Sequence, residues 1–277
     1  MVRRDARTRR TQHPRPHLKA YVVASAFDST LVLSSCGIAL SENLGLSPSR
    51  FEDKTVSLRA QNLVQPGAEL TYLLLHDPEY RTRTRKEHLV RAGHEILPKR
   101  NVRELAAFLG GGIDACRFDF HIISALPQDM VESALEDIVP ADHIHGTRLL
   151  YDASGKVEGA ARVNTGHGKV MVLDSLQDVT WAGVIYMGGS SSDVHAMLYV
   201  NARQGLTIAA SEDRSIAHIA RRTVLSDDAL SLLVPILRDI IGWDTKRICA
   251  FWDAHGLTVY DWEQLWTAPI LSPYGPV

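Results

Sequence analysis

The sequence predicts an α/β fold, in which helices cover both faces of a mainly parallel, doubly wound sheet. Short apolar runs of strand length, at residues 21–24, 118–123 and 181–187, each end in a polar or glycine-containing turn. Such runs are typical of the buried strands of these sheets. Segments with helical spacing of apolar residues lie between them. Because strands that alternate with helices are joined by crossover connections, this order favours parallel pairing.

Length and composition are those of an ordinary globular chain. The protein has 277 residues, of which 45% are hydrophobic and 22% charged, and its formal net charge is −2. A chain of this length can bury a sizeable core. Its net charge does not indicate nucleic acid or an anionic membrane as a partner. No run approaches the roughly 18 apolar residues of a membrane span. We therefore expect no membrane and no nucleic-acid partner.

The N-terminal residues and the cysteines indicate where in the cell the protein is located. Residues 1–19 carry seven Lys and Arg against one acid, Asp5, and we expect a disordered, solvated tail rather than an interaction arm. Its paired arginines resemble an export signal, but the apolar stretch behind them is the first strand of the fold. The three cysteines, Cys36, Cys116 and Cys249, are not spaced like a metal-binding pair, and because their number is odd at least one would stay unpaired in any disulfide scheme. We expect a reduced, cytoplasmic location.

The first half of the chain contains one strand and then a helical block. The strand leads into Ala26–Thr30, at the strand end where open α/β sheets bind ligands. Nothing alternates with period two from Pro48 to about Leu109. A basic cluster at 81–91 is interpreted as a solvated helix face, with contact to an anionic substrate as the alternative. Helices are expected at 34–44, from Pro48 onward, and at 102–109, where Gly110–Gly112 ends the apolar stripe.

The second half returns to alternating elements. A β-hairpin is expected around the turn at 152–155, because strand-like runs flank an Asp-Ala-Ser-Gly sequence. After the last strand, an N-cap signal at Ser226–Asp228 precedes a strongly apolar helix, expected at 229–241 with a kink at Pro235. The other expected elements are strands at 118–123, 181–187, 206–209 and 223–225, and helices at 128–139 and 166–176 and through 200.

The turn after the first strand resembles a known catalytic motif. Residues 26–30 read Ala-Phe-Asp-Ser-Thr and resemble the Asp-x-Asp-x-Thr motif of the haloacid dehalogenase-like (HAD) hydrolases, in particular their phosphoserine-phosphatase-like branch. In that family the first Asp is the nucleophile and the second is the general acid/base. Asp28 and Thr30 match the motif, whereas Ala26 stands at the nucleophile position. The resemblance therefore implies the fold of a phosphatase without the residue that starts its reaction.

Three later residues extend the resemblance over most of 20–225. Ser124 ends the second long strand, where the family has a Ser or Thr that hydrogen-bonds the phosphoryl group. Lys169 opens a helix and matches the Lys that balances the charge of phosphate and nucleophile. Asp193 matches the second acid of the Gly-Asp-Gly-x-x-Asp loop, and Gly189 stands in place of the first. The implied domains are a Rossmann-like core (20–33 and 113–225), a helical cap (34–112) and a helical C-terminal extension (226–277).

The same departures weaken the implied metal site. In the family, Mg²⁺ is held by the nucleophile carboxylate, the carbonyl of the second Asp and acids of the later loop. The ligands that remain here are Asp28 and Asp193, and Mg²⁺ binds through so few carboxylates that each one counts. We therefore expect no cofactor, with Mg²⁺ bound only if this weak residual site is used.

The resemblance implies a small phosphorylated or anionic ligand, bound by Ser29, Ser124, Ala125, Lys169 and Ser190. Three functions stay open. The first is a pseudo-phosphatase that binds a phosphate ester without hydrolysing it. The second is a repurposed, metal-independent enzyme for elimination, isomerisation or cyclisation, with Asp28 as general acid/base. The third is a phosphomonoesterase seen in altered form, with Ala26 natural or engineered.

Weaker signals are interpreted as structural. His143-x-His145 would place two imidazoles on one face of a strand, but no third metal ligand lies nearby in the sequence. His167 and His195 are the only histidines near the motifs that could activate a serine at 190–192. Four tryptophans near the C-terminus are expected in core or dimer contacts rather than in a ligand platform, so a homodimer stays open. They are Trp243, Trp252, Trp262 and Trp266.

Overall fold

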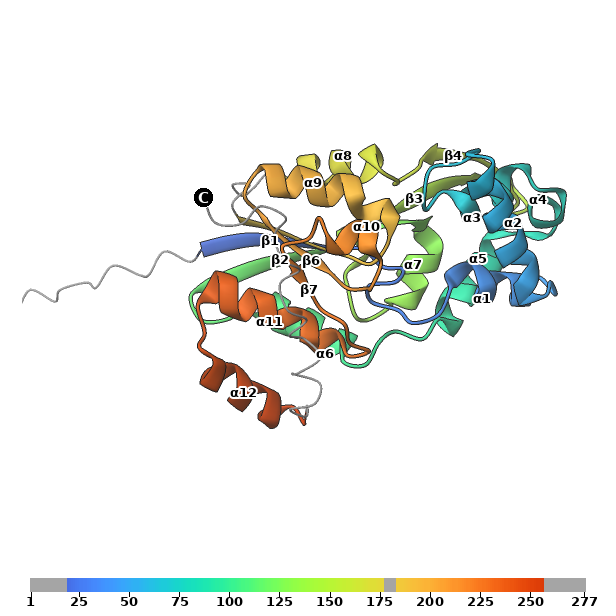
Figure 1. Cartoon of the computed structure of the whole chain (residues 1–277). Helices are drawn as coiled ribbons and strands as arrows, with labels where there is room; N and C mark the ends of the chain where they lie inside the picture. Colours follow the sequence, from blue (N-terminus) through green and yellow to red (C-terminus); the bar gives the residue numbers. More distant parts are fainter. Residues whose placement is uncertain (1–18, 177–182, 257–277) are drawn as a thin grey trace, which may run out of the picture.

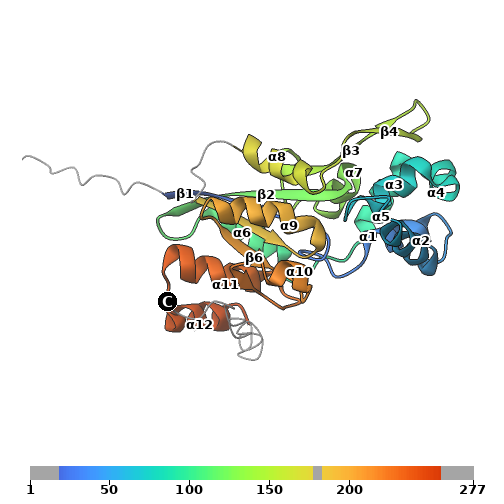
Figure 2. The ribbon, with the colours of Figure 1, turned by 45° about the horizontal axis from the view of Figure 1, so that its top comes forward.

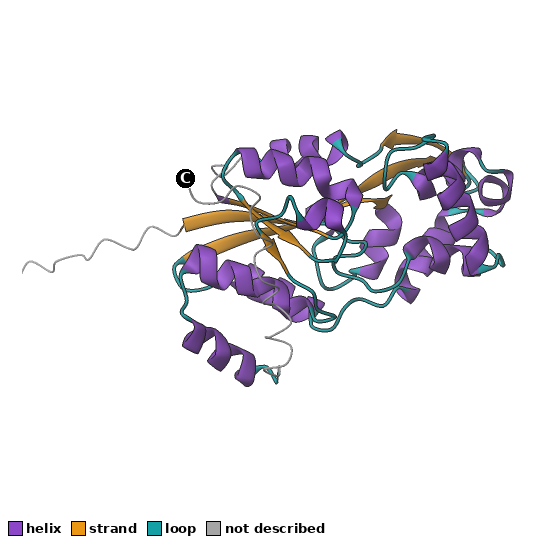
Figure 3. Ribbon diagram, viewed as in Figure 1, coloured by secondary structure: helices purple, strands orange, loops and turns teal. Residues whose placement is uncertain are grey.

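The computed structural model describes residues 19–176 and 183–256 and has three layers, with helices on both sides of a central sheet (Figures 1 and 3). The predicted α/β fold class is confirmed. The predictions for the basic tail up to residue 18, for Trp181, and for Trp262 and Trp266 lie outside the described residues. No described helix is long and apolar enough to cross a membrane.

The described sheet has seven strands in the order β4-β3-β2-β1-β5-β6-β7. The central strand, β1, pairs in parallel with β2 and β5, and only β3 and β4 pair antiparallel, as the predicted hairpin. The strands are β1 Lys19–Ser25, β2 Cys116–Pro127, β3 Ile144–Tyr151, β4 Val157–Arg162, β5 Val184–Gly188, β6 Leu206–Ala209 and β7 Arg222–Thr223.

Alternation along β1 divides the core into two parts. Val23 packs with the larger cluster, which includes Leu105 and Leu109, whereas Ala24 packs with Val172 and the apolar residues on the other face. In Figures 1 and 2, α8 and α9 lie on one side of the sheet and α6 and α11 on the other. Both faces of the sheet are thus buried, which explains the continuous apolar strands of the sequence.

The helices α1 to α5 form a separate group beyond the carboxyl end of β1 (Figures 1 and 2). The predicted cap boundary at residue 112 would include α6, which packs beside β2. The division into domains stays a prediction. The helices are α1 Cys36–Asn43, α2 Pro48–Ala60, α3 Glu69–His76, α4 Pro78–Arg83, α5 Lys86–Glu95, α6 Val102–Gly111, α7 Gln128–Ala134, α8 His167–Ser175, α9 Val194–Ala202, α10 Arg214–Ala217, α11 Leu233–Pro235 and α12 Thr245–Ala254.

The two connections between the sheet and α1 to α5 are fastened to each other. The backbone N–H of Lys99 donates to the carbonyl of Leu31 (2.8 Å), beside an isolated bridge between Val32 and Pro98. The returning connection is also fastened to the segment after β7. There, the Lys99 ammonium donates to the Ser226 carbonyl (2.9 Å) and the Asn101 amide donates to the Asp228 carboxylate (2.7 Å). We call these residues (31–32, 98–101 and 226–228) the connector clamp.

Three local predictions differ from the structure. The expected helix at 229–241 is divided into a 3₁₀-helix, a single turn of α-helix and a π-helix, because Pro235 has no N–H to donate within a regular helix. The helix expected to reach 139 ends at Ala134, and Asp137 has a left-handed backbone (φ 59°). His143 lies in the 3₁₀-turn Ala141–His143 before β3, so His143 and His145 do not share a strand.

Candidate functional site

A cavity of about 380 Å³ lies where β1, β2 and β5 end. This is the edge at which open parallel sheets bind their ligands. Residues of α1 to α3 and their connections complete its lining, so the cavity lies between the sheet and the separate helical group. The predicted site residues that line it are Ala26, Asp28, Ser29, Ser124, Ala125, Lys169, Gly189 and Ser190.

Position 26 presents a methyl group to the cavity. Ala26 follows directly after β1 and its backbone N–H donates to the carbonyl of Met187 in β5 (2.8 Å). The hydroxyl of the preceding Ser25 donates to the Ala26 carbonyl (2.7 Å) and is buried. Ser25 does not line the cavity, so this serine does not replace a nucleophile at position 26.

Asp28 lines the cavity in the turn that follows β1. Burial raises its pKa to about 6, and the neighbouring Lys169 charge opposes part of this shift. The thiol of Cys36 donates a hydrogen bond to its Oδ1 (3.8 Å). Thr30 does not line the cavity; its hydroxyl donates to the Asp28 carbonyl (3.4 Å) and so holds the turn. A carboxyl group with a pKa near 6 is suited to donate or accept a proton at neutral pH.

Lys169 and Asp193 form a buried ion pair below the cavity. The Lys169 Nζ lies 2.5 Å from Asp193 Oδ1 and donates to the Ser192 hydroxyl (3.1 Å), and both charged side chains are at most 2% exposed. The second partner of Oδ1 is the hydroxyl of Tyr186 (2.7 Å). Asp193 Oδ2 accepts the backbone N–H groups of Gly189 and Ser190, each at 3.0 Å. Both oxygens of this carboxylate therefore already have partners within the protein.

Several hydrogen-bond donors are left for a ligand. Ser124 Oγ accepts the backbone N–H of Leu126 (3.2 Å), which leaves the Ser124 hydroxyl proton available. Among the described residues, the backbone N–H groups of Asp28 and Ser29 donate to no other backbone group. Ser29 has a left-handed backbone (φ 57°), which is uncommon for a residue with a side chain.

The loop after β5 touches the turn after β1. A Cβ atom built on Gly189 would lie 2.0 Å from the carbonyl oxygen and 2.4 Å from the carbonyl carbon of Ser29. These are backbone atoms, so rotating a side chain cannot relieve the overlap. Position 189 therefore requires glycine for close approach of two backbones, and a carboxylate there would need both loops to move.

These observations test whether the residues fit Mg²⁺, the metal that the family usually uses. Position 26 offers no carboxylate, position 189 has no room for one, and both Asp193 oxygens are occupied by protein donors. The Asp28 carbonyl accepts the Thr30 hydroxyl. Mg²⁺ demands a near-octahedral set of oxygen ligands, and positions 26, 189 and 193 do not supply the carboxylates with which the family holds it.

The helical group contributes charged residues that sequence reasoning missed. Arg59 of α2 and Glu69 of α3 both line the cavity and form an ion pair (Nε to Oε1, 2.7 Å). Glu69 is buried, whereas Arg59 is largely exposed. No local pattern singles them out, because each belongs to an ordinary helix and only the tertiary fold brings them over the end of the sheet.

Comparison with known proteins agrees with the geometry. The model of the haloacid dehalogenase-like hydrolase family matches residues 23–198. A phosphoserine phosphohydrolase-like protein from Francisella tularensis is 18% identical, with a TM-score of 0.59, covering 78% of this chain and 99% of that one. A substrate-bound phosphoserine phosphatase gives the same identity and score, covering 78% and 97%.

A HAD family hydrolase from Salmonella enterica serovar Typhi is 14% identical with a TM-score of 0.62, covering 80% of this chain and 73% of that one. Likenesses at this identity show the fold alone. No curated protein matches the chain. The family model spans well over half of the sequence and includes the end of β1 and all of β2, α8 and β5, the elements around the cavity. The chain therefore belongs to the haloacid dehalogenase-like hydrolase family.

Proposed function

We propose that the protein binds a small phosphorylated or anionic molecule in this cavity and does not hydrolyse it through an aspartyl nucleophile. The observation that carries the proposal is the combination of ligand-facing donors with a methyl group at position 26. Some structural neighbours act on phosphoserine by their names, so a phosphomonoester is the first substrate class to test.

Anion binding is supported by the hydrogen-bond donors, and the charge of the site makes it depend on pH. The hydroxyl of Ser124 and the N–H groups of Asp28 and Ser29 can each donate to an oxygen of the ligand. Lys169 is paired with Asp193 and Arg59 with Glu69, and Asp213 also lines the cavity, so protonation of Asp28 removes one of the uncompensated negative charges. Protonation of Asp28 below pH 6 should therefore favour a bound anion.

Loss of hydrolysis is supported by the absence of a substitute nucleophile. The Ser190 hydroxyl hydrogen-bonds to Ser192 (2.8 Å) and lies near Asp193, which is itself held by Lys169. A serine becomes nucleophilic through an adjacent base such as histidine, and among the described residues no histidine lines the cavity. His167 and His195 thus do not reach the serines of this loop from within the cavity.

Sulfate is the probe, because its own charge stays constant between pH 5 and pH 8. Any change in its affinity over this range therefore reports a change in the protonation of the protein. We expect sulfate to bind more tightly at pH 5 than at pH 7.5, and Asp28→Asn to remove most of this difference. Ser124→Ala should weaken binding about tenfold, the value of one hydrogen bond to a charged group. Ser175→Ala in α8, whose hydroxyl bonds only its own helix, is the matched control. Equal sulfate affinity in Ser124→Ala and wild type would exclude this cavity as the anion site.

Hydrolysis is tested with p-nitrophenyl phosphate and phosphoserine in the presence of Mg²⁺. We expect no metal-stimulated turnover, because losing a nucleophile removes several powers of ten in rate and each tenfold step is about 1.4 kcal/mol. Robust turnover that a chelator abolishes would contradict the proposal.

A second candidate function is acid/base catalysis by Asp28 without a metal. It is favoured by one observation: a carboxyl group whose burial raises its pKa to about 6 lines the cavity. Such an enzyme would eliminate, isomerise or cyclise its substrate. Its rate would follow the titration of Asp28 and be abolished in Asp28→Asn, whereas a pure binding protein would keep its ligand in that variant.

A further inference from the structure

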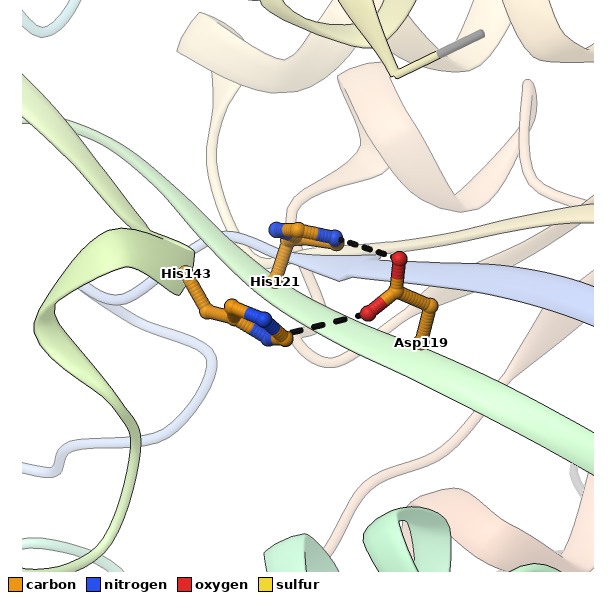
Figure 4. A group of neighbouring side chains, drawn as sticks. All are labelled: Asp119, His121 and His143. Carbon is orange, nitrogen blue, oxygen red and sulfur yellow. Dashed lines mark ion pairs between the residues drawn. The ribbon is translucent and has the colours of Figure 1, made fainter. Parts of the chain in front are cut away.

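A second group of side chains lies outside the cavity, on the strand β2 and the turn before β3. Asp119 and His121 are two residues apart on β2, so they share one face of the sheet, and His143 approaches from the 3₁₀-turn (Figure 4). One ligand atom of each residue lies within 4.8 Å of those of the other two. We propose that Asp119, His121 and His143 bind a divalent transition-metal ion of the Zn²⁺ class.

The unsatisfied nitrogen of His121 is the first argument. His121 Nε2 is buried and has no hydrogen-bond partner, although it lies 3.1 Å from Asp119 Oδ2. The other nitrogen, Nδ1, is 3.2 Å from His145 Nε2. When Nδ1 donates to His145, Nε2 holds a lone pair that faces a carboxylate. Two acceptors that face each other in a buried place are costly, and a cation between them satisfies both.

The spacing of the three residues fits a small ion. Zn²⁺ binds histidine nitrogen and carboxylate oxygen at about 2.0–2.2 Å, so two ligands of a tetrahedral site lie about 3.3–3.5 Å apart. The His121 Nε2–Asp119 Oδ2 separation is 3.1 Å, and a ring nitrogen of His143 lies within 4.8 Å of ligand atoms of both residues. Rotation of partly exposed side chains therefore closes the site without moving β2.

Hydrogen bonds set which nitrogen of each imidazole can bind an ion. The rings of His121 and His143 stack at 4.4 Å with an angle of 20°, so their in-plane lone pairs run nearly parallel, and the partly exposed His143 must turn out of the stack to share an ion with His121. His143 Nδ1 donates to the carbonyl of Phe120 (2.9 Å), so its Nε2 keeps the lone pair that a metal needs. His145 fixes His121 from the opposite side. A second hydrogen bond to each ligating histidine is the usual arrangement in metal sites.

Exposure and ligand type indicate which ion fits. The side chains of Asp119 and His143 are 52% and 32% exposed, whereas that of His121 is 7% exposed, so an ion can enter from solvent and stop against a buried ligand. Two imidazoles and one carboxylate suit Zn²⁺ and its first-row neighbours better than Mg²⁺ or Ca²⁺. Three protein ligands leave a position for water. None of the three residues lines the cavity, so this site is independent of the proposed anion binding.

The test is calorimetric titration of Zn²⁺ into the full chain, expressed without a histidine tag and freed of metal with a chelator. We expect binding that weakens at least tenfold in Asp119→Asn, an exposed and isosteric change that spares the fold. His143→Ala should weaken binding by a similar factor, and His145→Ala about tenfold through loss of the support for His121. His94→Ala is the matched control, because His94 is a half-exposed histidine that pairs with Glu136 (3.0 Å) and is not one of the three proposed ligands.

Co²⁺ provides a second readout, since its visible absorption distinguishes four- or five-coordinate nitrogen and oxygen ligation from the hydrated ion. The Co²⁺ spectrum and a Zn²⁺-dependent rise in melting temperature should both be lost in Asp119→Asn and be retained in Asp28→Asn, which alters only the cavity. Equal Zn²⁺ affinity in wild type and Asp119→Asn, or loss of binding in Asp28→Asn instead, would overturn the proposal.

Discussion

The contact between Gly189 and Ser29 makes a sharp prediction about restoring the family's chemistry. If only two carboxylates were missing, the double change Ala26→Asp with Gly189→Asp would return Mg²⁺-dependent hydrolysis. We expect no such return. Before its carboxylate can reach any ligand position, the new side chain at 189 must first displace the backbone of Ser29.

The size of the effect follows from the overlap. A Cβ at 189 would lie 2.0 Å from the Ser29 oxygen, where real Cβ contacts are almost never under 3.0 Å, so one loop must move by about 1 Å. Overpacking of this kind costs about 1–3 kcal/mol. Each kcal/mol lowers the melting temperature of a domain of 150–250 residues by about 2–4 °C. Gly189→Ala, which adds the Cβ alone, should therefore melt several degrees below wild type.

The assay compares two glycine-to-alanine variants by thermal melting. Gly110 lies on the exposed side of α6 and a Cβ there meets nothing within 4 Å, so Gly110→Ala should be neutral or gain up to about 1 kcal/mol from helix propensity. Gly189→Ala should lose stability under the same conditions. Wild-type stability in Gly189→Ala would refute the steric argument. The double variant that combines Ala26→Asp with Gly189→Asp is expected to stay inactive. Mg²⁺-dependent turnover by this variant within about a hundredfold of an ordinary phosphatase would refute that expectation.

Two further predictions concern buried charge. The pKa of Asp28 is raised from 3.8 to about 6. Its contribution to the free energy of unfolding is therefore complete below pH 4 and is lost as the pH rises through 6. The shift corresponds to at most about 3 kcal/mol, and the measured loss should be smaller because the carboxyl group faces the cavity. Chemical denaturation at pH 4 and pH 7.5 should show this loss in wild type and not in Asp28→Asn, and equal pH dependence of the two would contradict the burial argument. Asp193→Asn leaves the buried Lys169 ammonium without its counter-ion and should cost about 3–5 kcal/mol. The double variant with Lys169→Met should be more stable than Asp193→Asn alone, and strictly additive losses would show that the pair is not coupled.

Much of the fold was predictable because its signals are local. The apolar runs of β1 and β2, the hairpin turn at 152–155 and the proline at the start of α2 each act on their own neighbours in the chain. Ser124 and Lys169 were identified by the resemblance to the HAD motifs, and both line the cavity. Pro235 was predicted as a kink and does lie at an interruption; the local pattern could not predict that the segment would divide into 3₁₀-, α- and π-helical pieces.

The parts of the site that sequence could not predict depend on contacts between distant segments. The role of Gly189 depends on the carbonyl of Ser29, 160 residues earlier, and not on a turn of its own. Asp119 and His121 precede His143 by more than twenty residues, so a search for ligands beside His143 and His145 could not find them. Arg59 and Glu69 reach the cavity only because their helices fold over the end of the sheet.

The connector clamp bears on how fast a ligand enters and leaves. Both connections to the helical group are bonded to each other, and the returning one is bonded to residues 226–228, beyond the segment that matches the family model. Opening by separation of the two connections would break several hydrogen bonds at once. The helical group is also held at a second place, where the backbone N–H of Lys86 donates to the carbonyl of Gly155 (2.8 Å) and the Lys86 ammonium pairs with Asp129 (3.0 Å). Residues 226–228 thus help to hold the connections to the helices around the cavity, although they do not line the cavity themselves.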